Sequence, residues 1–285
     1  MLPFALTLPV LYFTMCCSHY AYIIETYSSA PELTGWREIK DMRRNHPLLH
    51  HIAEMMQYYF RGRLVRSAAL SPDELYVFGY HPHGIMPLTV FWLRIGSAWE
   101  RSFPGVSFSP LTASVMHLVP VMRDILQWMG GREVSRESIQ LALRSRTNCL
   151  LIPGGQAEMM ESSSAIDEIV LVTRHTGFIK LAMQERAKLV PVLSIGEVDL
   201  LDNVSIPKVQ RWFLKRIGFA APFNPYGRWY LPIPRPAAVT VVVGKPVTVA
   251  VPGVAAPAST SPSDADLKRA MIDYFGEIQR IFDRH

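Results

Sequence analysis

Cysteine and charge are both scarce in this 285-residue chain, and their scarcity excludes several classes of protein. The three cysteines form no Cys-x-x-Cys pair and are too few for a disulfide framework, so the sequence indicates a reducing compartment or a cytosolic face. Charged residues make up 19% of the chain, hydrophobic residues make up 49%, and the mean hydropathy is +0.13. This balance is apolar for a soluble enzyme and too polar for a transporter with many membrane spans.

The first part of the chain lacks charge altogether. No Asp, Glu, Lys or Arg occurs before Glu25, and the apolar run is about as long as a bilayer crossing requires. The run also lacks the basic start of a secretory signal. We therefore predict that residues 1–24 form a hydrophobic membrane-anchor segment, either a span or a re-entrant hairpin. A hydrophobic strap packed on the domain is the alternative.

Residues 25–70 are expected to form an interfacial helical region. The segment from Trp36 to Phe60 mixes basic residues with methionine and tyrosine, and Pro47 is expected to divide it into two helices. Basic amphipathic helices after an apolar anchor are typical of a membrane surface, and an ordinary surface helix is the alternative. No later stretch reaches eighteen uncharged apolar residues, so residues 71–285 should be one globular domain.

The net charge of +5 and the isoelectric point near 9.1 favour a partner with negative charge. Anionic membrane lipid and a phosphorylated substrate both fit this balance. Nucleic acid is not expected as a partner, because no dense basic run with interleaved aromatic residues occurs.

Short apolar segments alternate with helical patterns through the rest of the chain. This alternation predicts an α/β fold with a mainly parallel central sheet flanked by helices. The C-terminal helix is the clearest, since Ser263 and Asp266 form a capping box ahead of a 3.6-residue apolar period. Strands are expected at residues 75–79, 149–152, 169–173, 189–195 and 239–243, and helices at 87–99, 120–129 and 176–186 and after Ser135.

The segment LYVFGYHPHGIMP carries the main candidate for chemistry. An apolar strand ends at Gly79, and His81 and His83 follow, separated by Pro82 and followed by Gly84. Ligands of open α/β sheets bind beyond the carboxyl ends of the strands, and neutral imidazole accepts a proton well near pH 7. We therefore predict an enzyme with a histidine base at the sheet edge.

Two other chemistries fit the sequence less well. A serine hydrolase usually carries Gly-x-Ser-x-Gly at a strand–helix turn, and no such motif occurs. A metal site on His81 and His83 would need a third ligand, and the local spacing fixes none, so no metal is expected. A histidine that acts directly on a hydroxyl needs only the two substrates and the imidazole held together away from water.

Two further segments are candidates for substrate binding. Pro153, Gly154 and Gly155 follow a strand, and the two glycines let the backbone approach a ligand and adopt positive φ. Glu158 lies just beyond them. Arg174, Gly177 and Lys180 surround the expected start of a helix, whose backbone N–H groups favour an anion.

The Tyr-His-Pro-His-Gly motif resembles the signature of the type-2 diacylglycerol acyltransferase family, which includes monoacylglycerol and wax-ester acyltransferases. The resemblance covers about residues 30 to 285. Further blocks match in the family's order, namely LTASVMHLVPVMRDILQWMGG with SRESI, then IPGGQAE, RHTGFIKLA, LVPVLSIGE, GRWYLPIPRP, VGKPV and YFGEIQRIFDRH.

The resemblance implies an enzyme that moves a fatty acyl group from acyl-CoA to the hydroxyl of a neutral lipid acceptor, with no cofactor. Diacylglycerol is the expected acceptor and triacylglycerol the product. A monoacylglycerol, wax-ester or phytyl-ester acyltransferase is the alternative, and a catalytically inactive lipid-binding protein on a membrane anchor is another. The family implies the endoplasmic reticulum membrane with the catalytic domain facing the cytosol, or a lipid droplet. A homo-oligomer is compatible with the sequence.

The resemblance also implies roles for the candidate residues. His83 is favoured as the base over His81, because some plant members resemble Glu-Pro-His-Ser and keep only the second histidine. His81 would then support His83, and backbone N–H groups near Gly84 would hold the oxyanion. Related enzymes use His-x-x-x-x-Asp, but Met86 and Leu88 stand at the matching positions here, so another group must set the imidazole tautomer.

Two of these roles concern the substrates. In phospholipid-forming relatives the loop of Glu158 carries an arginine that binds the acceptor's phosphate. Glu158 in that region favours an acceptor without phosphate, and it is also a candidate for orienting the catalytic imidazole. Arg174 and Lys180 would bind the phosphates of coenzyme A.

Overall fold

The computed structural model describes residues 14, 17–18, 20–24, 29–119, 121–165, 168–204, 206–217, 224–249 and 262–285. Most of the predicted anchor at residues 1–24 lies outside the described residues. Within the described ranges, none of the helices combines the length and the apolar composition that a bilayer crossing needs.

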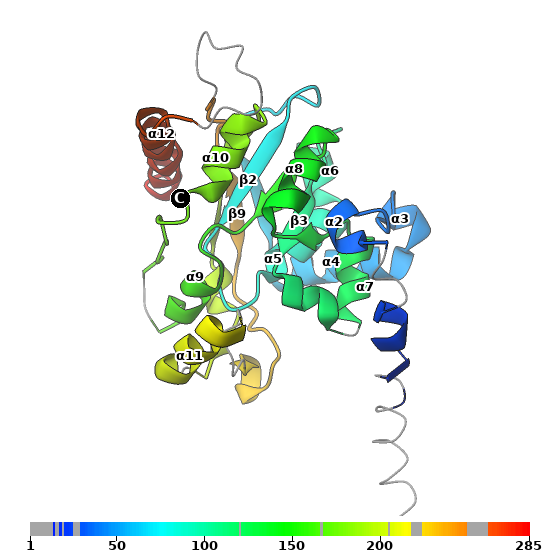
Figure 1. The fold of residues 1–285 in the computed structure, drawn as a ribbon. Coiled ribbons are helices and arrows are strands. Elements are labelled where there is room, and N and C mark those ends of the chain that lie inside the picture. The colour runs from blue at the N-terminus through cyan, green and yellow to red at the C-terminus, as the bar shows by residue number, and fades with distance from the viewer. Residues whose placement is uncertain are drawn as a thin grey trace, which may run out of the picture.

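The described residues form a seven-stranded sheet in the order β1-β9-β6-β2-β5-β3-β4 (Figure 1). β2 pairs in parallel with β5 and β6, and β6 pairs antiparallel with β9. The predicted α/β fold with a mainly parallel sheet is therefore confirmed. The strand bounds are β1 Arg63–Arg66, β2 Tyr76–His81, β3 Ser109–Thr112, β4 Arg132–Glu133, β5 Cys149–Leu151, β6 Lys188–Ile195 and β9 Thr240–Val243, and β7 Asp202–Asn203 pairs with β8 Pro225–Tyr226 in a small second sheet.

Helices cover both faces of the sheet. One core cluster packs α4, α5 and α6 against Tyr76, Phe78 and Tyr80 of β2, and the other packs α8, α10 and α12 against Val77. Successive residues of β2 thus pack into the cores on opposite faces of the sheet, as the two-residue period of a strand requires. The helix bounds are α2 Pro31–Thr34, α3 Met42–Asn45, α4 Pro47–Tyr59, α5 Leu88–Ile95, α6 Ala98–Ser102, α7 Met122–Trp128, α8 Arg136–Arg144, α9 Gly155–Glu161, α10 Gly177–Gln184, α11 Pro207–Ile217 and α12 Asp264–Phe282.

Most of the predicted elements are present. Ser135 caps α8 and Ser263 caps α12, each hydroxyl accepting a backbone hydrogen bond at 3.1 Å. The helix expected over residues 87–99 divides at Gly96 into α5 and α6. β1 lies within residues 25–70, so that region contributes a strand of the central sheet beside its helices.

The strand predicted at residues 169–173 is wrong. Residues 169–172 form neither a helix nor a strand, and a turn follows at Thr173. The N–H of Val172 donates to a carboxylate oxygen of Glu158 at 2.9 Å, so it is not available to a strand ladder. The β-branched residues of this segment suggested a strand, but the segment is held by a side chain instead.

Candidate active site

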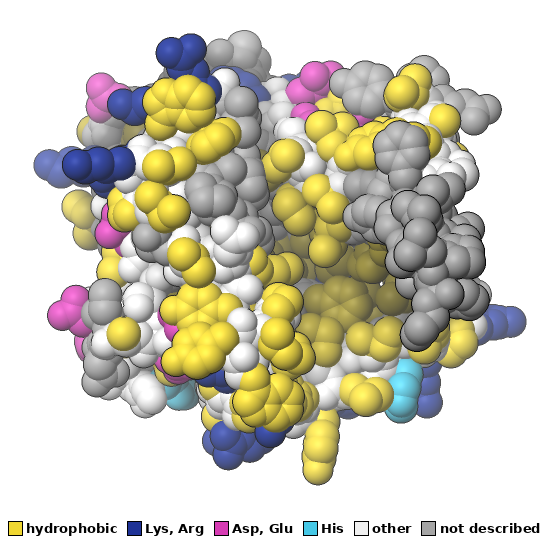
Figure 2. Space-filling view, turned by 90° about the horizontal axis from the view of Figure 1, so that it is seen from below, with side chains coloured by type: hydrophobic (Ala, Val, Ile, Leu, Met, Phe, Trp, Pro, Cys, Tyr) yellow, Lys and Arg dark blue, Asp and Glu magenta, His cyan; other side chains and the backbone are white. Residues whose placement is uncertain are grey.

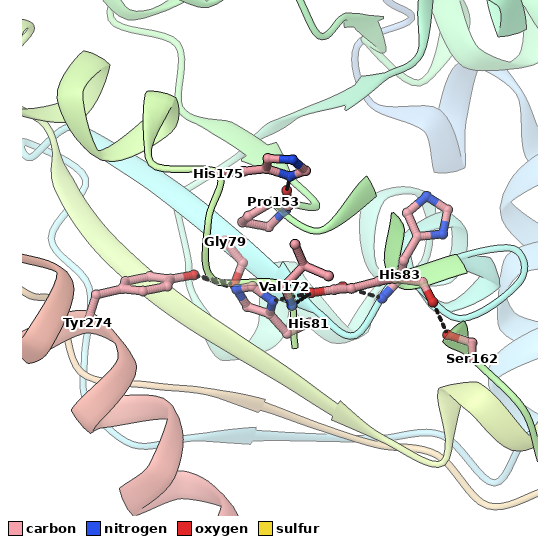
Figure 3. A network of polar contacts seen from close by, with 9 residues as sticks. Gly79, His81, His83, Pro153, Ser162, Val172, His175 and Tyr274 are labelled. Carbon is pink, nitrogen blue, oxygen red and sulfur yellow. Dashed lines mark hydrogen bonds and ion pairs between the residues drawn. The ribbon is translucent and has the colours of Figure 1, made fainter. Parts of the chain in front are cut away.

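His81 is the last residue of β2 and is fully buried. The strand period places it on the same face as Val77 and Gly79, toward α12. Its Nε2 lies 3.0 Å from the hydroxyl of Tyr274, and its Nδ1 lies 3.5 Å from Oε1 of Glu158 (Figure 3). His81 is therefore enclosed by protein groups in this structure.

His83 is partly exposed beyond the strand end, after a cis His81–Pro82 peptide bond. Its Nδ1 lies 3.0 Å from the carbonyl oxygen of Gly84. Because a carbonyl only accepts hydrogen bonds, Nδ1 carries the hydrogen, and in the neutral ring Nε2 carries the lone pair. The Gly84 carbonyl thus sets the tautomer of the neutral ring.

The electrostatic surroundings of His83 keep its ring neutral. Burial among protein atoms lowers its pKa from the ordinary value of 6.5, and this effect outweighs the opposing effects of the Gly84 carbonyl and Glu158. A neutral imidazole with a lone pair on Nε2 is the form that a general base needs at pH 7.

Glu158 lies on the first turn of α9 and is fully buried. One oxygen accepts the backbone N–H of His83 at 3.0 Å and the other accepts the N–H of Val172 at 2.9 Å. The carboxylate therefore fixes the backbone of His83, while its ring is oriented by Gly84. This differs from the sequence-based expectation that Glu158 orients the imidazole itself.

The glycines at the start of α9 allow Glu158 to fold back toward β2. A Cβ on Gly154 would lie 1.8 Å from Cδ of Glu158, and Gly155 has a φ of +51°, which favours glycine. The carbonyl oxygen of Pro153 accepts a hydrogen bond from Nδ1 of His175 at 2.9 Å (Figure 3). The Pro153 loop thus joins β5, α9 and the segment before α10.

The predicted anion-binding residues lie on the surface around the start of α10. Arg174, Gly177 and Lys180 are all exposed, and Nε of Arg174 lies 3.5 Å from Nε2 of His175. A Cβ on Gly177 would meet no atom within 4 Å, so packing does not require glycine there. His175 therefore connects this basic surface to the Pro153 loop.

Glu197 supports the site from the other face of β2. Its Oε2 accepts hydrogen bonds from the hydroxyls of Tyr80 at 2.6 Å and Ser194 at 3.1 Å, and its Oε1 accepts one from the backbone N–H of Thr89 at 3.3 Å. Burial raises the pKa of Glu197, and the hydrogen bonds oppose that effect. Gly84 has a φ of +59°, and a Cβ there would lie 3.2 Å from Cγ of Glu197. The glycine after His83 therefore packs directly against Glu197.

Sequence reasoning missed Tyr274, which contacts His81 and Gly79 from α12. Its place in the apolar stripe of α12 indicated packing alone, and no sequence signal linked it to His81, 193 positions earlier. As for metals, the described parts of the chain hold no group of three or more His, Cys, Asp or Glu placed to bind an ion.

The face seen from below in Figure 1 is hollowed, and hydrophobic side chains line the hollow (Figure 2). α9 and α11 lie at this end of the molecule (Figure 1). Large hydrophobic side chains are exposed on several segments, including Trp212 of α11 and Trp229 and Tyr230 of the 3-10 turn Arg228–Tyr230. The carboxyl ends of β2, β5 and β6 point the same way, since the three strands are parallel.

Comparison with known proteins identifies the class. The family described as diacylglycerol acyltransferase matches residues 7–285. Diacylglycerol O-acyltransferase 2B of Umbelopsis ramanniana is 31% identical over 91% of this chain and 75% of its own length. Human diacylglycerol O-acyltransferase 2 is 34% identical over 80% of this chain and 61% of its own length. The crystal structure of the 1-acyl-sn-glycerophosphate acyltransferase PlsC from Thermotoga maritima matches with a TM-score of 0.47 and 11% identity, over 96% of this chain and 97% of that one.

The chain is therefore an acyltransferase by family. It belongs to the diacylglycerol acyltransferase family, as the histidine motif and the seven further blocks predicted. It spans about three fifths of the human enzyme's length and three quarters of the fungal enzyme's length.

Proposed function

We propose that this protein transfers a fatty acyl group from acyl-CoA to the free hydroxyl of diacylglycerol and forms triacylglycerol. The observation that carries the proposal is the state of His83. Its Nδ1–H is held by the Gly84 carbonyl, its Nε2 has no hydrogen-bond partner among the described residues, and burial favours the neutral ring. These are the properties of a base that accepts a proton from an alcohol.

In the proposed mechanism, Nε2 of His83 takes the hydroxyl proton as the acceptor oxygen attacks the thioester carbonyl carbon. The carbon–sulfur bond then breaks, the ester forms, and coenzyme A leaves as a thiolate that takes the proton back from His83. Backbone N–H groups near Gly84 are candidates for stabilising the oxyanion. Neither a covalent acyl-enzyme nor a cofactor is required.

The surroundings of Glu158 support an acceptor without phosphate. The carboxylate is buried and already accepts two backbone hydrogen bonds, and α9 contains no Lys or Arg. This segment therefore offers no cation to the phosphate of a phosphorylated acceptor. A neutral diacylglycerol needs none.

Acyl-CoA binding is proposed at the start of α10. Arg174 and Lys180 are exposed cations near a helix N-terminus, a place that favours phosphate groups. His175 links this surface to Pro153, two residues beyond β5. Coenzyme A held there would carry its thioester toward the carboxyl edge of the sheet.

Membrane lipid is the proposed partner of α11 and of the neighbouring aromatic turn. α11 carries Lys208, Arg211, Lys215 and Arg216, all exposed, and no acidic residue. Exposed Trp212 lies among them, and basic helices with tryptophan on one face suit an anionic membrane surface.

α11 is also close to the catalytic loop, which comprises His83 and the residues that follow it. Leu214 of α11 packs against a small cluster that contains Ile85, Met159 and Leu201, with Met86 beside it. Ile85 and Met86 follow His83 by two and three residues, so a bilayer that binds α11 would lie next to the site where the lipid acceptor reacts. An endoplasmic reticulum membrane or a lipid-droplet surface would supply such an acceptor.

An acceptor panel tests the proposed function. Purified full-length protein in mixed micelles receives labelled acyl-CoA with diacylglycerol, monoacylglycerol, phytol or a long-chain alcohol, and the esters are separated by thin-layer chromatography. We expect triacylglycerol to be the main product. A preference for the alcohols would make the protein a wax- or phytyl-ester synthase. The absence of any acceptor-dependent ester would favour a lipid-binding protein.

A further inference from the structure

Tyr274 is a fully buried tyrosine in the middle of α12, 193 residues after His81. Its ring packs edge-on against Phe178 and Phe275 within the core between α12 and the sheet. A buried hydroxyl is costly unless it forms hydrogen bonds. This one donates to the Gly79 carbonyl at 3.1 Å and lies 3.0 Å from Nε2 of His81 (Figure 3).

The strand opposite Tyr274 is shaped for this approach. A Cβ on Gly79 would lie 1.9 Å from the tyrosine oxygen, so only glycine leaves room for the hydroxyl. Glycine inside a strand weakens it and often marks the close approach of another group. Here the close group is a side chain from the other end of the chain.

The hydrogen-bond directions follow from the chemistry of the three groups. The Gly79 carbonyl cannot donate, so the single hydroxyl hydrogen of Tyr274 points to it. The tyrosine oxygen then accepts from His81, whose Nε2 carries a hydrogen. Burial and the nearby carboxylate of Glu158 raise the pKa of Tyr274 well above 10, so the hydroxyl keeps its hydrogen at neutral pH.

Tyr274 thus reaches the catalytic loop through a continuous set of contacts. With the Nε2 hydrogen of His81 donated to Tyr274, Nδ1 faces Oε1 of Glu158 at 3.5 Å, a contact that is an ion pair only when Nδ1 is protonated as well. The same Glu158 accepts the backbone N–H of His83 at 3.0 Å. His81 therefore lies between two fixed groups, one on α12 and one on α9.

We propose that Tyr274 is a positioning residue for acyl transfer, because its hydroxyl fixes His81 and thereby, with Glu158, the backbone from which His83 acts. This inference rests on the proposed function of His83. A tyrosine that served only to fill the core could be replaced by phenylalanine with a loss of stability but with no specific effect on turnover.

The test compares Tyr274→Phe with Tyr76→Phe in the full-length protein. Tyr76 is a matched control, since it is buried, lies at the start of β2, and its hydroxyl accepts a hydrogen bond from Ser71 at 2.9 Å. Thermal unfolding and circular dichroism show whether each variant folds. We expect Tyr274→Phe to lower kcat roughly 10- to 100-fold with little change in KM for acyl-CoA, since small misplacements of catalytic groups cost that much. Tyr76→Phe should keep its kcat.

A double-mutant cycle with His81→Leu shows whether Tyr274 acts through His81. If it does, the double variant loses little more kcat than His81→Leu alone. The inference is overturned if Tyr274→Phe keeps full turnover while His83→Ala is inactive, or if the losses from Tyr274→Phe and His81→Leu simply multiply. Full turnover in His83→Ala would instead overturn the role of His83, so the two failures can be told apart.

Discussion

Replacement of Glu158 by glutamine should impair both folding stability and turnover, although the two side chains have nearly the same shape. The carboxylate accepts the N–H groups of His83 and Val172 with its two oxygens. Glutamine offers one oxygen and one NH₂ group. Whichever way the amide is turned, one of the two backbone N–H groups faces another donor.

The size of the effect follows from these contacts. A hydrogen bond to a charged group contributes about 1.5–3 kcal/mol, and a buried donor left unpaired costs about 1–3 kcal/mol. Glu158 is fully buried, so water does not compensate. We expect Glu158→Gln to lower the free energy of unfolding by roughly 3 kcal/mol and, by releasing the His83 backbone, to lower kcat by up to about 100-fold.

Urea unfolding and acyl transfer to diacylglycerol, measured on the same preparations, check this prediction. Glu277→Gln is the control, because Glu277 is also a buried glutamate that accepts a backbone N–H, from Lys245 at 3.0 Å. Lys245 follows the C-terminal end of β9 and does not contact the His83 loop through this bond. The control should lose stability and keep its kcat. Unchanged turnover in Glu158→Gln would leave Glu158 as part of a turn and refute its role in holding His83.

Three further predictions concern pH, the membrane and the last helix. The acid limb of the kcat/KM profile should have an apparent pKa below 6.5, because burial lowers the pKa of His83 and the base stays neutral until the pH falls through its lowered pKa. An acid limb with an apparent pKa above 6.5 would contradict this. Turnover of diacylglycerol in vesicles should rise with phosphatidylserine content, because α11 is basic. The double variant Lys215→Glu, Arg216→Glu should weaken that dependence, and the matched double variant Lys268→Glu, Arg269→Glu on α12 should leave it intact. Equal effects of the two double variants would refute α11 as the membrane contact. Ser263→Ala should lower the free energy of unfolding by about 1 kcal/mol through loss of the α12 cap, with kcat unchanged below the transition; an unchanged unfolding curve would show that the cap contributes nothing.

The sequence could predict the features that depend on local patterns. An apolar run predicted the strand before His83, although β2 ends at His81 and not at Gly79. Glycine and serine at short range predicted the turn at the start of α9 and the caps of α8 and α12. These features were enough to place a histidine base at the carboxyl edge of a parallel sheet.

The contacts that set the chemistry could not be predicted, because they join distant residues. Glu158 holds the His83 backbone across 75 residues, and Tyr274 reaches His81 across 193. A second contact of Glu158, across 14 residues, explains the wrong strand at residues 169–173, where Val172 donates to Glu158 rather than to a neighbouring strand. β1 was also missed, since its four residues pair only with β9 near the other end of the chain.

The most direct test of His83 as the base is the replacement His83→Ala in full-length, membrane-associated protein whose folding is confirmed by circular dichroism. Loss of a general base typically lowers the rate by about 10²–10⁴-fold, and we expect acyl transfer to diacylglycerol to fall by that amount. If folded His83→Ala protein retained most of its acyl transfer, His83 would not be the base and the mechanism would be wrong.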